Sequence, residues 1–174
     1  MIQSTLQSES RLGFITVVET PELGFSGGLL VVNTLGRPIE FHCTAAMKVN
    51  RAQKILYGRT YQSFLFCDQI AASLIEHSQS QPLAYVTDCT DLMPLTESVD
   101  APVLLLPKES DTATQRTDLG HFQLNDRRLW FKSFEDEQTE PLRNLCETLN
   151  ETLPIDEPLS RIREAISEAQ AAAR

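Results

Sequence analysis

The sequence contains few of the side-chain patterns that mark a metal site or a disulfide-stabilised scaffold. Its four cysteines, Cys43, Cys67, Cys89 and Cys146, lie far apart and form no CxxC pair, whereas zinc sites and small disulfide-rich domains usually carry closely spaced cysteines. The three histidines share no ligand spacing with one another or with the cysteines. We therefore expect reduced thiols, no metal and no cofactor, in a cytoplasmic protein.

Long hydrophobic runs are also absent. No apolar stretch approaches the ~18–20 residues that a membrane-spanning helix needs, and the first residues do not combine a basic start with an apolar core, as a secretory signal would. The sequence therefore predicts neither a membrane partner nor secretion.

The sequence has fewer positive than negative side chains, with 15 Lys and Arg against 24 Asp and Glu, and its formal net charge is −9. Such a field opposes nucleic acids and anionic membranes, so nucleic acid is not expected as a partner. One stretch, between Glu40 and Asp68, contains no acidic residue and carries Lys48, Arg51, Lys54 and Arg59. We interpret this stretch first as a solvated helix face, then as a local site for an anion or an acidic protein.

Nucleotide-binding and hydrolase motifs are missing as well. Residues 24–28, GFSGG, precede a predicted strand and are followed by no lysine, whereas phosphate-binding glycine loops open a helix. No GxSxG nucleophile elbow occurs. The sequence therefore identifies no catalytic residue and favours a protein that is not an enzyme.

The sequence does contain enough apolar residues, 41% of 174, for one globular domain. Residues 39–44 give the clearest strand, in which Ile39, Phe41 and Cys43 alternate with polar residues and should face the core. A helix over 61–78 should connect this strand to a parallel one at 83–87 in a βαβ unit. Further strands are predicted at 14–18, 29–32, 102–106, 119–124 and 128–134.

These elements predict a single α/β (α+β) domain, with a mixed β-sheet of about six strands, one βαβ crossover helix and two C-terminal helices. Residues 11–152 should form the domain, 153–174 a C-terminal amphipathic helix that packs on it, and 1–10 a flexible N-terminus. The order of the elements is similar to that of the longin, roadblock and profilin-like folds, and no shared motif accompanies this likeness. Likeness of fold does not by itself imply a function.

One candidate site lies at the carboxyl ends of the two strands of the βαβ unit, where ligands of α/β sheets tend to bind. There Lys48 and Arg51 should approach Asp88 and Asp91, so that two cations and two carboxylates surround a crevice. This arrangement could hold a small anionic ligand. Turn chemistry and surface ion pairs explain the same residues and are the favoured interpretation.

A second candidate is the helix at 61–78, whose only charge between Tyr61 and Ile75 is Asp68. Low charge together with retained aromatic residues is typical of an interface core. We expect its large apolar side chains to form a twofold interface; these are Tyr61, Phe64, Leu65 and Phe66. The alternative is that the C-terminal helices cover this surface within the same chain.

The leading functional hypothesis is a protein-interaction or scaffold module that acts as a homodimer or binds another protein. The alternative is a small-molecule (anion) binding domain, or an enzyme, with a site near Lys48, Arg51, Asp88 and Asp91. An enclosed polar pocket at these residues would favour the alternative, and a flat surface would favour the scaffold.

Overall fold

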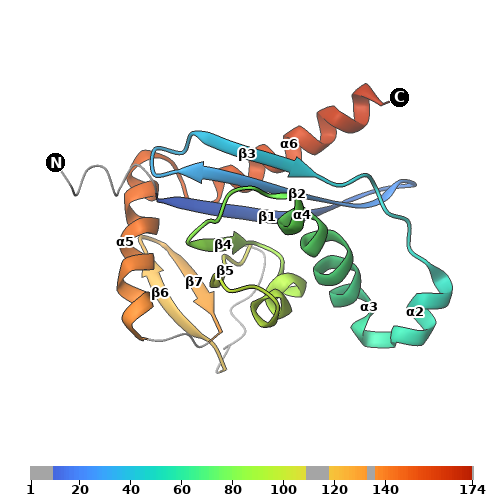
Figure 1. Cartoon of the computed structure of the whole chain (residues 1–174), viewed down its shortest axis with the longest axis horizontal. Helices are drawn as coiled ribbons and strands as arrows, with labels where there is room; N and C mark the ends of the chain where they lie inside the picture. Colours follow the sequence, from blue (N-terminus) through green and yellow to red (C-terminus); the bar gives the residue numbers. More distant parts are fainter. Residues whose placement is uncertain (1–9, 109–117, 133–135, 174) are drawn as a thin grey trace.

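A seven-stranded mixed sheet is the centre of the structure, a computed structural model that describes residues 10–108, 118–132 and 136–173 (Figure 1). Residues 1–9 of the expected flexible N-terminus lie outside these ranges. The strand order is β3-β2-β1-β4-β5-β7-β6. The strands are β1 Arg11–Thr20, β2 Gly24–Asn33, β3 Pro38–Cys43, β4 Ala84–Thr87, β5 Val103–Leu105, β6 Gly120–Leu124 and β7 Arg127–Phe131. The predicted fold class, a single α/β domain with a mixed sheet, is confirmed.

The first three strands form an antiparallel meander, and the turn between β1 and β2 depends on Gly24. This residue has a φ of 103°, and a Cβ atom built on it would lie 2.1 Å from the carbonyl oxygen of Met47. Only glycine combines this backbone conformation with such a close approach. Gly24 therefore serves a structural turn, whereas Gly27 and Gly28 lie within strand β2.

The crossover from β3 enters the sheet at a different place from the one predicted. β4 pairs in parallel with β1, with Phe14 opposite Val86, and β3 remains at the edge of the sheet beside β2. Because β1 and β2 lie between β3 and β4, the carboxyl ends of the two predicted neighbours are separated by two strands. The strand that lies next to β4 on this side is β1.

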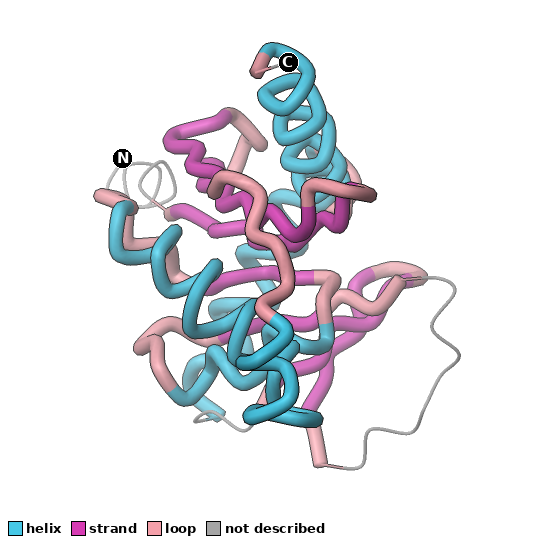
Figure 2. The backbone as a smooth tube through the Cα atoms, turned by 90° about the vertical axis from the view of Figure 1, so that its right-hand side faces the viewer, coloured by secondary structure: helices cyan, strands magenta, loops and turns pink. Residues whose placement is uncertain are grey.

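Helical segments cover both faces of the sheet. The crossover contains α2 Arg51–Tyr57, the 3₁₀ segment η1 Gly58–Thr60, and then α3 Tyr61–Ser63, the π-helical segment η2 Phe64–Ala71 and α4 Ala72–His77. The remaining segments are the 3₁₀ helix η3 Thr90–Glu97, α5 Asp136–Thr152 and α6 Glu157–Ala172. α6 lies on one side of the sheet and α3–α4 on the other (Figures 1 and 2).

Each face of the sheet has its own apolar core, because neighbouring residues of a strand point to opposite sides. Phe14 and Leu30 pack with α5 and α6, whereas Ile15 and Leu29 pack with η2 and η3. Ile162 and Ile166 belong to the first core, so α6 is an integral part of the domain's packing.

The aromatic residues proposed as an interface are covered by the chain itself. Tyr61, Leu65 and Phe66 are 4–6% exposed within the second core, and Phe64 is half-buried. The sheet and η3 cover them, rather than the C-terminal helices, which lie on the opposite face. Burial inside the domain explains the low charge of this helix without a partner.

The edge position of β3 changes the burial that its alternating pattern predicts. Phe41 lies on the face that α6 covers, as its contact with the Cβ position of Gly28 shows, but it is 39% exposed. The expectation that Phe41 and Cys43 are core residues is wrong, since α6 packs mainly over β1 and β2. The pattern identified the faces correctly but not how far α6 extends over the sheet.

All four cysteines are free. Cys67 and Cys146 are buried, and burial raises the pKa of the Cys67 thiol to about 11 and that of Cys146 to about 12. In the described part of the chain, no helix is long and apolar enough to cross a membrane.

Glu40 fixes the edge strand to the segment that precedes β4. Its carboxylate accepts hydrogen bonds from the hydroxyl of Ser78 and from the backbone N–H groups of Gln79 and Ser80, and it contacts His42. The hydrogen bond with Ser80, followed by those with His42 and the backbone, holds the pKa of Glu40 well below its usual value, against the opposing effect of desolvation.

We expect Glu40→Gln to lower the free energy of unfolding by about 1–3 kcal/mol at pH 7, because a hydrogen-bonded carboxylate is lost. A lowered folded-state pKa stabilises the protein above the unfolded value of about 4.3, and this contribution disappears as the pH falls. Urea melts at neutral and acidic pH should therefore show a difference that shrinks in acid. Glu164→Gln, at an exposed position, is the control, and equal losses in the two variants would contradict the role of Glu40.

Candidate functional site

A buried polar contact joins the middle of the sheet at the carboxyl end of β4. The parallel register that pairs Phe14 with Val86 places Thr16 opposite Asp88, two residues further along each strand. The Thr16 hydroxyl donates a 2.7 Å hydrogen bond to Oδ1 of Asp88, and both residues are buried, at 1% and 8% exposure. The carboxylate thus lies at the edge of the first core.

The second oxygen of this carboxylate faces helix α6. Arg163 donates a hydrogen bond from Nη2 to Oδ2 of Asp88 and forms an ion pair with it. A carboxylate at this depth requires such a partner, because an unpaired buried charge is strongly unfavourable. The Arg163 side chain is 36% exposed, so the pair forms one wall of an open site.

Polar contacts continue along α6 toward the turn between β1 and β2. Gln170 accepts a 3.0 Å hydrogen bond from the Thr20 hydroxyl and donates one of 3.2 Å to the Ser26 hydroxyl. Together with Arg163, Gln170 fixes the orientation of α6 across the two strands. The polar atoms here are satisfied within the chain, and the open part of the site lies toward β5 and β7.

A crevice of about 420 Å³ opens beside the Asp88–Arg163 pair. Its polar lining comes from the ends of β4 and β5, from the start of β7 and from α6, and consists of Asp88, Lys108, Arg127, Asp156, Ser160 and Arg163. Three cations and two carboxylates give this lining a formal net charge of +1, in a chain whose net charge is −9. The crevice is therefore locally cationic.

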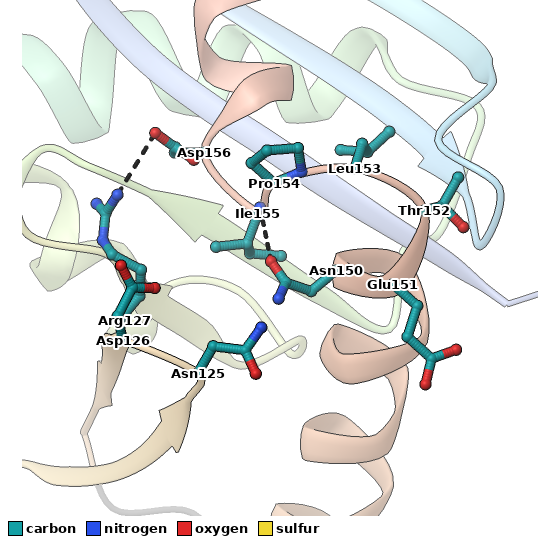
Figure 3. A pocket seen from close by; sticks show the side chains of 10 residues that line it. All are labelled: Asn125, Asp126, Arg127, Asn150, Glu151, Thr152, Leu153, Pro154, Ile155 and Asp156. Atoms are coloured by element: carbon teal, nitrogen blue, oxygen red, sulfur yellow. Dashed lines mark hydrogen bonds and ion pairs between the residues drawn. The ribbon is translucent and has the colours of Figure 1, made fainter.

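The Arg127–Asp156 ion pair separates this crevice from a neighbouring hollow. Arg127 lies 3.4 Å from Asp156 and also donates a 3.1 Å hydrogen bond to the backbone oxygen of Pro107. Figure 3 shows the neighbouring hollow between the β6–β7 turn and the α5–α6 connection, where the side chain of Asn150 accepts from the backbone N–H of Ile155. Its lining includes Asp126 and Glu151, and it shares Arg127 and Asp156 with the crevice, whereas Lys108 and Arg163 line the crevice.

The four residues of the predicted anion site lie on different elements. Lys48 and Arg51 lie in the exposed segment around α2, Asp88 in the crevice and Asp91 in η3. No hydrogen bond or ion pair between described residues joins either cation to either carboxylate. The four-residue site stays a prediction without a contact to support it.

The partners of Asp88 were not identified from the sequence, because both are far from it along the chain. Arg163 occurs in an ordinary charged helix, and its position gives no sign of a partner. Thr16 gives a weak signal, since it is the one polar residue between Phe14 and Val18 in an apolar strand. A buried polar side chain in such a strand requires a hydrogen-bond partner.

No protein-family model and no curated protein matches the sequence. Solved structures do match. The catalytic domain of human endonuclease V has a TM-score of 0.57 and 13% identity, over 93% of this chain and 84% of that one. A variant of Ciona intestinalis endonuclease V, in complex with DNA containing an inosine followed by a ribo-adenosine, has a TM-score of 0.58 and 10% identity, over 92% of this chain and 86% of that one. The chain has the fold of endonuclease V.

This similarity corrects two of the functional expectations. A homodimeric scaffold or protein-interaction module was the leading hypothesis, and nucleic acid was not expected as a partner. Both are overturned, because the structural neighbours are nucleic-acid enzymes, two of them in complex with DNA. The alternative hypothesis, a ligand-binding domain or enzyme, agrees better with these neighbours. The net charge of the chain averages over its surface and therefore conceals a local cationic crevice.

We expect the Asp88–Arg163 pair to show strong coupling. Arg163→Leu should cost about 2–4 kcal/mol of stability, because it leaves the buried Asp88 carboxylate unpaired. Adding Asp88→Asn should recover part of this loss, so the double variant should lose less stability than the two single variants lose together. Urea melts of the four proteins measure the coupling. Strictly additive effects would mean that the pair does not hold α6 in place.

Proposed function

We propose that this chain binds DNA in the cationic crevice between the ends of β4 and β5 and helix α6. The observation that supports the proposal most is the gathering of Lys108, Arg127 and Arg163 in one crevice, on a fold shared with proteins that have been solved with DNA. Phosphate groups of a nucleic-acid backbone are bound mainly by such cations.

The three cations differ in how available they are. Lys108 is exposed and forms no ion pair with a described residue, so no carboxylate among the described residues competes with a phosphate for it. Arg127 is held 3.4 Å from Asp156, a carboxylate that is itself half-exposed. Arg163 is committed to Asp88. Lys108 should therefore be the principal phosphate ligand, with Arg127 and Arg163 held in place beside it by their carboxylate partners.

The carboxylates outside the crevice should limit the affinity. With a net charge of −9, the rest of the surface repels a polyanion. Binding should therefore depend on close contact at the crevice and should weaken less steeply with rising salt concentration than in a protein with a long basic stripe. This is the electrostatic behaviour of a site that contacts a short stretch of backbone.

Strand cleavage is not part of the proposal. Metal-assisted nucleases hold their ions mainly with clustered oxygen ligands. Among the described residues no three His, Cys, Asp or Glu side chains come together in a way that could hold a metal. In the crevice, moreover, the two oxygens of Asp88 already accept hydrogen bonds from Thr16 and Arg163. These residues do not fit a metal centre, so we derive no hydrolytic step from them.

The cytoplasmic location remains part of this proposal, with the four free cysteines as its support. Reduced thiols suit a reducing compartment.

Lys108→Ala should weaken binding to a labelled DNA oligonucleotide and lower the slope of log K against log salt by about 1, because one phosphate contact is lost. Fluorescence anisotropy over a series of salt concentrations measures both quantities. Arg37→Ala is the matched control, since it removes an exposed cation from the turn between β2 and β3. Oligonucleotides with inosine or guanosine at the same position should be compared. An unchanged affinity in Lys108→Ala would contradict the crevice as the binding site.

Binding should also be independent of divalent metal, and the oligonucleotide should remain intact. We expect the same anisotropy curve in Mg²⁺ and in EDTA at matched ionic strength, with no shortened product on a denaturing gel. Metal-dependent cleavage that Asp88→Asn abolishes would show instead that Asp88 is a metal ligand.

A further inference from the structure

The outer strands β6 and β7 have one face in the first core and one face with exposed side chains. Phe122 and Leu129 point toward α5 in the first core, so the alternating residues of β6 and β7 point to the other side. His121, Gln123 and Arg128 are exposed there, and Trp130 is half-buried. We call these four residues the β6–β7 face.

Two aromatic rings lie side by side on this face. His121 and Trp130 are directly opposite each other in the antiparallel register, and their ring centroids are 4.8 Å apart at an angle of 47°. Trp130 is the only tryptophan of the chain, and the domain does not use it as a fully buried core residue. The guanidinium carbon of Arg128 lies 5.5 Å from the centre of its ring.

The cation Arg128 lies beside these rings. Arg128 forms no ion pair with a described residue, and its nearest polar partner is Gln123, at 3.4 Å. Lys132, directly after β7, pairs with Glu97 at 2.6 Å, and both of these side chains are largely exposed. Exposed aromatic rings beside cations, on an open sheet, are what proteins use to stack unpaired bases.

From this arrangement we infer that the β6–β7 face binds unpaired bases of a nucleic acid, which stack on Trp130 and His121 while Arg128 contacts the backbone. The inference rests on the proposed DNA binding in the crevice and extends it to a second contact. It also narrows the substrate class to nucleic acid with a single-stranded segment, since bases inside a duplex present no free ring face.

The two contacts are close enough for one nucleic-acid strand to reach both. Arg127 and Arg128 are neighbours that point to opposite faces, the first into the crevice and the second beside Trp130. Trp130 follows Arg127 by three residues, which is roughly 10 Å along a strand. A strand bound in the crevice need only pass the end of the β6–β7 hairpin to place its next bases on Trp130.

The intrinsic fluorescence of Trp130 tests this inference directly, because no other tryptophan contributes. Addition of oligothymidylate should quench the emission, whereas an abasic oligonucleotide of the same length should bind more weakly and leave the emission nearly unchanged. Polyglutamate controls for charge. Quenching by polyglutamate, or equal quenching by the abasic strand, would overturn base stacking and would indicate a face that recognises acidic chains in general.

Variants provide the second measurement, by anisotropy with labelled oligothymidylate. Trp130→Ala should weaken binding by about 5- to 150-fold, the range measured for base–aromatic stacking, and Trp130→Phe should restore most of the affinity. His121→Ala should also weaken binding, and His77→Ala, at an exposed histidine on α4, should not. If no nucleic acid binds at all, the proposed function fails. If binding depends on Lys108 but not on Trp130, only this inference is overturned.

Discussion

The carboxylate of Asp88 is the constraint on which the candidate site depends. It joins three elements through one buried group, since it directly follows β4 and accepts hydrogen bonds from Thr16 on β1 and from Arg163 on α6. These partners are 72 and 75 residues away in the sequence. A buried carboxylate without them would be unstable, so the fold holds α6 against β1 at this point. The crevice lies beside this contact, and its cationic wall includes the same arginine.

Strand β7 connects the crevice with the aromatic face. Because side chains alternate along a strand, the five residues of β7 divide between two faces. Arg127 lines the crevice and two apolar residues pack in the core, whereas Arg128 and Trp130 point to the opposite face. The same alternation explains how a chain with a net charge of −9 can place Arg127 in the crevice and Arg128 on the opposite face. Local charge at each surface is decided by which residues share a face, and net charge contains no information about that.

Much of the sheet could be predicted from local patterns, but the pairing of its strands could not. Alternation in residues 39–44 correctly divides them between two faces, yet Phe41 is partly exposed because β3 lies at the edge, where α6 offers little cover. The crossover helix was also expected correctly. Its destination was wrong, since β4 pairs with β1, and this changes which residues surround Asp88. The low charge of the helix at 61–78 was interpreted as an interface, whereas the sheet and η3 bury it.

The sequence by itself determined the class of the fold, because this depends on composition and on patterns within about ten residues. It also placed Asp88 correctly at the end of a strand. Only the tertiary structure decided the partners of that residue, the crevice formed by Lys108, Arg127 and Arg163, and the exposure of Trp130. The physical reason is that these features arise from contacts between distant segments. A hydrogen bond across 72 residues leaves no periodic trace in the sequence on either side.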